Sequence, residues 1–348
     1  MSLRDQEVTA LESLGYTTEE ARFIYVVAVH SGYFMSRQFL RFTGAEGGNR
    51  CYTFAVKLQR RGHATRREYH QIGCVYRLAS TRLYRFIAKQ NLPPRPRSHA
   101  VEFIRQRLLH LDFILENLEF AYFETESEKT VYFCDVLGIP KTALPAKAYK
   151  GALGANPTVR YFVDRFPMYL DHTVPNNPPV ITFSYIDAGG PSVRGFLTHV
   201  QAYLPLLRRL ERFAFVFIAS SATHFMGAEK CFSNLMREFL RPGMSADILR
   251  CFRLRNAWER KQYGSLSTPD VEWLKEASRR FQGEWFEASY RAWASGTLSD
   301  EAFRIEFEQL HPDGQVFFRT CLTPAWHSGK KHLAWEAARA PDPSPSSA

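Results

Sequence analysis

Basic and polar side chains recur at helical spacing between Asn49 and Arg61, and their chemistry suits a nucleic acid. Guanidinium and ammonium groups bind phosphate oxygens, and polar side chains at the start of such a helix can reach base edges in the major groove. The polar stripe consists of Arg50, Thr53, Lys57, Arg60 and Arg61. A separate apolar face, spaced i, i+3, i+4, i+7, consists of Cys51, Phe54, Ala55 and Leu58. The spacing therefore predicts an amphipathic helix with a DNA-contacting stripe that begins at Asn49.

Other reactive residue types lack the spacing that their chemistry needs. The six cysteines are scattered and form no Cys-x-x-Cys pair, so we expect reduced thiols, no bound metal and no cofactor. The segments 151–156 and 188–190 contain glycines but match neither a phosphate loop nor a dinucleotide site. Ser220 and His224 stand outside a Gly-x-Ser-x-Gly turn, so we interpret them as turn residues, not as a nucleophile and its base.

The positive charge of the chain is concentrated in its first third. Residues 1–110 contain 18 Lys and Arg against 8 Asp and Glu, which accounts for the net charge of +10. Residues 111–348 contain 27 of each sign and are neutral. Such asymmetry between segments favours a polyanionic partner, most often a nucleic acid.

Three predicted helices precede and include the polar stripe. Thr17 followed by two glutamates predicts the start of the first helix, which ends at Ser31-Gly32. Ser36 is expected to cap a second helix over 37–42, and Asn49 a third over 50–61. Arg37, on the second helix, belongs to the predicted DNA-binding set.

A predicted β-hairpin follows the third helix. Residues 63–70 and 74–78 are extended runs around a glycine-containing turn, and a helix is expected over 81–91. Three helices followed by a hairpin is the order of a winged helix-turn-helix, in which the hairpin reaches the DNA beside the third helix. Arg66, Arg67 and His70 would contact DNA from this wing.

The predicted fold class is α+β. The winged helix occupies residues 1–92, and a stiff Pro- and Arg-rich linker occupies 93–98. An α/β sandwich is expected over 99–235, a helical region without strands over 236–338, and a disordered tail over 339–348. The sandwich would contain a long helix over 101–123, strands at 130–134, 159–163, 179–187 and 213–219, and a helix over 196–210.

This order resembles the replication-relaxation proteins of plasmids and other mobile elements, over about residues 15–225. The resemblance implies a winged helix joined to a domain like the PD-(D/E)xK nuclease core. Phe166-Pro167-Met168 stands where such a core has a Pro-Asp pair, and Asp187 stands where it has a second acid. Met168 is a poor ligand for Mg²⁺, and no acid-x-Lys follows Asp187, so the implied domain is a degenerate, non-catalytic one.

The sequence thus predicts a non-enzymatic DNA-binding regulator or accessory protein, with the second domain used for oligomerisation or partner contacts. Double-stranded DNA is the expected partner; a homodimer and other mobile-element proteins are further candidates. No apolar run approaches the roughly 20 residues of a membrane span and no signal core is present, so we expect a cytoplasmic protein without membrane contact. Two alternatives stay open: a Mg²⁺-dependent nuclease that uses Asp164 and Asp187, and a protein-interaction module without DNA contact.

Overall fold

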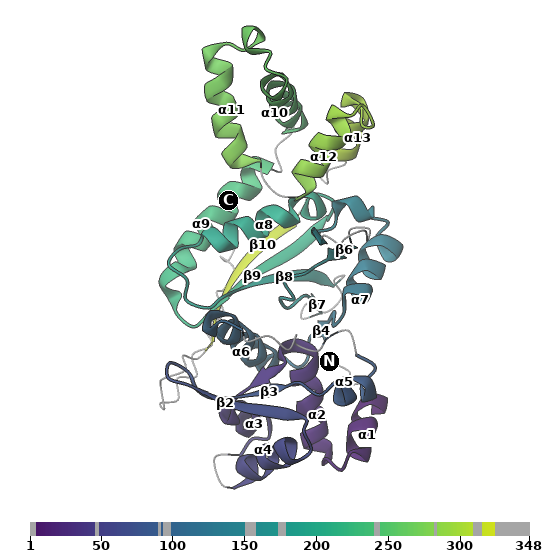
Figure 1. Cartoon of the computed structure of the whole chain (residues 1–348), viewed down its shortest axis with the longest axis vertical. Helices are drawn as coiled ribbons and strands as arrows, with labels where there is room; N and C mark the ends of the chain where they lie inside the picture. The colour runs from purple at the N-terminus through teal and green to yellow at the C-terminus, as the bar shows by residue number, and fades with distance from the viewer. Residues whose placement is uncertain are drawn as a thin grey trace, which may run out of the picture.

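The computed structural model describes residues 5–45, 49–89, 92, 99–149, 158–172, 179–239, 244–281, 284–308 and 315–323. The chain is a mixed α+β protein, with a small N-terminal sheet at one end, a five-stranded sheet in the middle and a helical extension at the other end (Figure 1). The predicted linker at 93–98 and the predicted tail at 339–348 lie outside the described residues. Within the described ranges, every helix is too short or too polar to cross a bilayer.

The N-terminal helices begin and end near the predicted positions. After α1 (Asp5–Ser13), α2 (Thr18–Val26) begins at a capping box, in which the Thr17 hydroxyl accepts from Glu20 N and the Glu20 carboxylate accepts from Thr17 N. A π-helical turn, η1 (Val27–Ser31), continues α2 to Gly32, whose φ of 78° stops the helix. The prediction for this helix is confirmed at both ends.

The next two helices, α3 (Ser36–Phe42) and α4 (Arg50–Arg60), are also present, but Ser36 is not the cap of α3, and Asn49 occupies the cap position of α4 without a capping bond. Ser36 is the first residue of α3, and the helix start is closed instead by the Gln38 side chain, which accepts from Met35 N at 2.9 Å. Asn49 precedes α4 but its side chain makes no capping hydrogen bond. That leaves the Asn49 side chain exposed at the helix start.

The predicted hairpin is confirmed and forms part of a three-stranded sheet. β2 (Ala64–Tyr69) and β3 (Gly73–Leu78) pair antiparallel, and β1 (Tyr33–Phe34) pairs with β3, so the strand order is β1-β3-β2. β1 was not predicted, because two residues are too few to show an alternating pattern. α5 (Thr81–Phe86) is shorter than the predicted 81–91.

α6 (Val101–Glu116) lies between the N-terminal elements and the central sheet (Figure 1). The predicted helix was longer, over 101–123. α6 ends at Glu116, and the side-chain amide of Asn117 donates a hydrogen bond to the carbonyl of Phe113 at 2.8 Å. The edge strand β4 (Ala121–Tyr122) follows. Leu109, Leu111, Phe113 and Ile114 of α6 join one continuous apolar cluster that includes Phe23 in α2 and Ile218 in the central sheet.

The central sheet has the strand order β10-β9-β8-β7-β4. β8 (Val180–Asp187) and β9 (Arg212–Ala219) are the strands predicted at 179–187 and 213–219 and pair in parallel, and β7 (Tyr169–Asp171) pairs antiparallel with β8. Alternate side chains of β9 face opposite sides of the sheet. Phe215 and Phe217 pack under α8 (Arg194–Leu207), whereas Val216 and Ile218 face the cluster of α6.

Two sequence predictions about strands are wrong. Residues 130–134 are helical, in α7 (Glu126–Val131) and η2 (Tyr132–Val136), because Thr125 caps the segment by accepting from Glu128 N. The C-terminal region is not purely helical, since β10 (Gln315–Leu322) pairs in parallel with β9 at the edge of the sheet. The predicted strand at 159–163 exists as β6 (Thr158–Tyr161), but it pairs with β5 (Ala146–Tyr149) in a separate two-stranded sheet.

The helical extension is inserted between β9 and β10. α9 (Phe225–Phe239) follows β9 and packs against α8 and β10 beside the sheet (Figure 1), and the extension consists of α10 (Met244–Glu259), α11 (Thr268–Arg280), α12 (Glu284–Ala294) and α13 (Asp300–Glu308). Short 3₁₀ turns occur at Lys141–Ala143, Ala222–His224 and Tyr263–Ser265.

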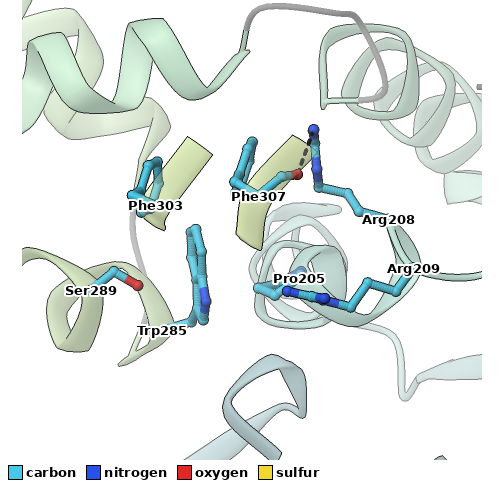
Figure 2. Close-up of a pocket in the computed structure, with 7 residues that line it drawn as sticks. All are labelled: Pro205, Arg208, Arg209, Trp285, Ser289, Phe303 and Phe307. Carbon is cyan, nitrogen blue, oxygen red and sulfur yellow. Dashed lines mark hydrogen bonds between the residues drawn. The ribbon is translucent and has the colours of Figure 1, made fainter. Parts of the chain in front are cut away.

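Figure 2 shows how α12 and α13 meet the end of α8: the buried guanidinium of Arg208 lies 3.9 Å from the ring centre of Phe307 and donates to its carbonyl.

Candidate nucleic-acid interface

The outer face of α4 is set by its packing. Phe54 and Leu58 are fully buried against the phenylalanines of α2 and α3, and the ring of Phe54 stacks on Phe39 at 4.1 Å. Because the helix turns 100° per residue, the positions opposite this face are 49, 53, 56 and 60. The polar stripe of the sequence therefore has its centre at Asn49, Thr53 and Arg60, and all three are exposed.

Arg60 is the least constrained cation on α4. Its side chain is exposed and forms no hydrogen bond or ion pair with any residue that the structure describes. Thr53 is also exposed, and its hydroxyl donates to the carbonyl of Asn49 at 3.0 Å. A cation that has no hydrogen bond within the protein gives up little interaction energy when it binds a phosphate oxygen.

Two other predicted residues of α4 are held by α2. Lys57 Nζ lies 2.5 Å from the carboxylate of Glu20, and Arg50 is paired with Glu19. The Arg50 and Glu19 side chains are each about half exposed, and exposed ion pairs of this kind contribute about 0–1 kcal/mol. A phosphate can therefore replace the Glu19 carboxylate as the partner of Arg50 at small cost.

Arg61 packs on the ring of Tyr16. Its guanidinium lies 5.1 Å from the ring centre, and Lys57 approaches the same ring at 5.1 Å. The Tyr16 hydroxyl is 2.6 Å from Nδ1 of the buried His63, and burial raises the pKa of Tyr16. A Cβ at Gly15, where φ is 82°, would lie 2.6 Å from the Arg61 guanidinium, so the glycine makes room for it. Arg61 is therefore exposed but held in place.

Arg37 does not belong to this interface, contrary to the sequence prediction. Its guanidinium makes two parallel bonds to Asp112 of α6, at 2.7 and 3.2 Å, and Asp112 is completely buried. The Gln38 amide also donates to Asp112, at 2.9 Å. A bidentate pair with a buried carboxylate fixes α3 on α6, so the role of Arg37 is structural.

The hairpin packs beside α4 and carries the predicted wing residues. Four consecutive residues of β2, from Thr65 to Glu68, are exposed, as is His70 at the turn. Arg66 Nε lies 2.8 Å from the Cys74 sulfur, and the Arg67 guanidinium lies 5.1 Å from the ring centre of Tyr69. Both contacts orient the arginines while leaving them exposed to solvent.

Tyr52 is an exposed residue of α4 that the sequence prediction did not include. Its side chain is 68% exposed on α4, one turn before the half-buried Val56. The signal was present in the sequence, because position 52 falls outside the apolar face formed by Cys51, Phe54, Ala55 and Leu58. Tyr52 was not selected because the predicted stripe consists of basic side chains and Thr53.

The two acids of the nuclease alternative are both bonded within the protein. Asp187, at the end of β8, accepts from Gly189 N and Gly190 N at 3.0 and 3.1 Å and lies 2.8 Å from His224 Nδ1. Asp164 accepts from the Tyr203 hydroxyl at 2.7 Å. Among the described residues, no group of three or more His, Cys, Asp or Glu side chains is placed to hold a metal ion.

Comparison of the chain with protein-family models, with curated proteins and with solved structures finds no match.

Proposed function

We propose that the chain binds duplex DNA through a winged helix-turn-helix made of α2, α3, α4 and the β2–β3 hairpin. α4 would lie in the major groove and the hairpin would reach the neighbouring backbone. The observation that carries the proposal is the outer face of α4, where Arg60 is exposed without an internal partner next to Asn49 and Thr53. The element order and the pairing of β1 with the hairpin also support it.

The contacting set differs from the one predicted from sequence. It keeps Asn49, Arg50, Thr53, Lys57, Arg60, Arg61, Arg66, Arg67 and His70, adds Tyr52, and loses Arg37. Arginines on α4 and the hairpin would bind phosphates, while Asn49 and Thr53 are placed where a recognition helix meets base edges. No observation favours the nuclease alternative, so the central sheet enters the proposal as a scaffold and a surface for partners.

The role in the cell follows from the same proposal. A regulator or accessory protein of a mobile element, as in the replication-relaxation family, would use the duplex-binding face to bind its DNA site. The neutral remainder of the chain, with 27 cationic and 27 anionic side chains over 111–348, would contact other proteins. The protein-interaction alternative differs only in the partner of the basic face, which a binding experiment distinguishes.

The decisive experiment measures duplex binding by the whole chain and by its Arg60→Glu variant. Fluorescence anisotropy with a labelled pool of random duplexes, and with DNA flanking its own gene, is expected to show binding that the variant weakens by about tenfold or more. If about five phosphates are neutralised, wild-type affinity should fall roughly 500-fold between about 50 and about 200 mM salt.

Arg237→Glu is the matched control, since Arg237 is an exposed arginine of α9 and the change in net charge is the same. It is expected to bind like the wild type. Equal weakening by both variants would mean that only net charge matters. A lack of wild-type binding to either DNA would contradict the proposal and favour an acidic protein as the partner of this face.

A further inference from the structure

A cavity of about 590 Å³ lies where the N-terminal elements, α6 and the segments 121–129 and 158–168 meet. The volume falls in the range of about 300–1,000 Å³ that small-molecule sites occupy. Aromatic rings form much of its wall, and Tyr122, Phe123, Phe162 and Phe166 are among them. The cavity therefore has the size and the apolar surface that a flat organic molecule needs.

Lys129 is the unusual charged group in this wall. Its side chain is 5% exposed and lies 5.6 Å from the ring centre of Phe162, and its ammonium has no ion pair or hydrogen bond within the described part of the chain. Buried lysines are rare unless they are paired. Burial lowers the pKa of the Lys129 ammonium, because the charged form loses its hydration.

The carboxylates of the same wall are already occupied. Glu124 lies 2.8 Å from Lys89 Nζ and accepts from the Tyr25 hydroxyl at 2.7 Å. Glu126 accepts from Arg160 Nε and from Tyr161 N, both at 2.7 Å. These two acids therefore have their charges balanced by other groups. Asp164 and Glu128 are the carboxylates that stabilise the charged Lys129 ammonium from a distance, and neither forms an ion pair or hydrogen bond with it in the described part of the chain.

His110 adds a second unpartnered donor. Arg107, which can only donate, lies 3.2 Å from His110 Nδ1, so Nδ1 is the acceptor and Nε2 carries the hydrogen. Nε2 of His110 is buried and has no hydrogen-bond partner among the described residues, and the same holds for Nε2 of His30. Both histidines line the cavity. Buried polar groups are nearly always satisfied, so the Nε2 hydrogen of His110 indicates a missing acceptor.

The backbone of the wall also departs from ordinary geometry. Phe162 has φ 49° and Arg165 has φ 57°, values in the left-handed region that few residues other than glycine adopt. Both residues line the cavity. Such strain costs about 1–3 kcal/mol per residue and clusters at functional sites.

We propose that this cavity binds a small organic anion with a flat apolar body, whose carboxylate or phosphate group is held by the Lys129 ammonium and the His110 Nε2 hydrogen. The aromatic rings would cover the body of the ligand. The anion supplies the acceptor that both donors lack. The proposal is independent of DNA binding, because neither α3 nor α4 contributes a residue to the cavity wall.

Calorimetric titration of the whole chain at neutral pH tests this with three probes that share one ring system: 2-naphthoate, 2-naphthyl phosphate and the neutral 2-naphthamide. At least one anion is expected to bind about tenfold or more tightly than the amide, since hydrogen bonds to charged groups are the strong ones. The better of the two anions identifies the head group.

Two lysine variants make the test specific. Lys129→Met keeps the length of the side chain and should remove the preference for the anion, while raising the melting temperature of the empty protein because an unpaired buried charge is lost. Lys141→Met, at an exposed lysine outside the cavity, should change neither. No saturable binding of either anion, equal binding of anion and amide, or an unchanged preference in Lys129→Met would each overturn the proposal.

Discussion

The outer face of α4 and the junction around α6 are both rich in cations, yet the two regions use them in opposite ways. On α4 and the hairpin, Arg60 is exposed without a partner and Arg66 is half exposed. At the junction, Arg107 is buried, and three of its contacts are with the backbone carbonyls of His30, Ser31 and Arg165. The first group is available to a ligand, and the second holds α6 against the N-terminal helices.

This difference shows that a charge count along the sequence is not a map of surface charge. Three basic residues of the first third are paired with acids that follow residue 110: Arg37 with Asp112, Arg41 with Glu116 and Lys89 with Glu124. The net charge of +10 counted over 1–110 is therefore partly neutralised in the fold. The unpaired positive charge is therefore smaller than the sequence count suggested, and besides α4 and the hairpin it includes the exposed Arg22 and Arg85.

A large expected effect concerns pH and the junction. Burial, with Arg107 nearby, lowers the pKa of His30 to about 3. Below about pH 6.5 the unfolded chain binds a proton that the folded chain does not, so stability falls as the pH decreases from about 6.5 towards 3. At about pH 4.5 the loss from His30 is roughly 2–3 kcal/mol. Urea unfolding at about pH 6.5 and at about pH 4.5 measures this loss of stability.

Two histidine variants separate the regions in that experiment. His30→Gln removes the buried titrating group, so its stability should depend less on pH over this range. His70→Gln removes an exposed histidine of the hairpin and should leave the pH dependence of unfolding as in the wild type. Identical pH dependence in the wild type and in His30→Gln would show that His30 is not held neutral by the fold.

Arg37 and Arg60 test the same contrast by truncation. Arg37→Ala leaves the buried Asp112 carboxylate with only Gln38 as a side-chain donor among the contacts described, and an uncompensated buried charge costs about 3 kcal/mol or more. Arg60→Ala removes an exposed side chain and should change the free energy of unfolding by less than about 0.5 kcal/mol. Urea titration of both variants is the measurement. Similar small losses in both would place Arg37 among the dispensable surface cations.

Much of the N-terminal architecture could be predicted because its signals are local. The Thr17 capping box, the glycine at position 32 and the extended runs around Gly73 each lie within a few residues of the feature they specify. The errors have a different origin. Residues 130–134 have strand-like side chains, but the Thr125 cap decides in favour of a helix, and β10 pairs with a strand about 100 residues earlier, which periodicity cannot show.

The candidate sites show the same limit. The stripe on α4 could be read from helical spacing, yet spacing alone could not show that Arg37 turns towards Asp112, which lies 75 residues away along the chain. The cavity was invisible in the sequence for a similar reason. Lys129 and His110 lie on different elements, and what makes them notable is the absence of partners among the described residues rather than any motif.

The smallest predicted effect concerns Tyr52 and refines the description of the exposed region. If a hydroxyl and a ring on the outer face of α4 contact the backbone of bound DNA, Tyr52→Ala should weaken duplex binding by roughly tenfold and leave the free energy of unfolding within about 0.5 kcal/mol of the wild type. Tyr263→Ala, at a tyrosine that is 53% exposed in the helical extension, is the matched control and should bind normally. Anisotropy with the same duplexes measures both. Normal binding by Tyr52→Ala would restrict the DNA contacts of α4 to its cations and to Asn49 and Thr53. The exposed region would then bind DNA through charged and polar groups without an aromatic contribution, whereas the cations of the junction remain buried and hold α6 in place.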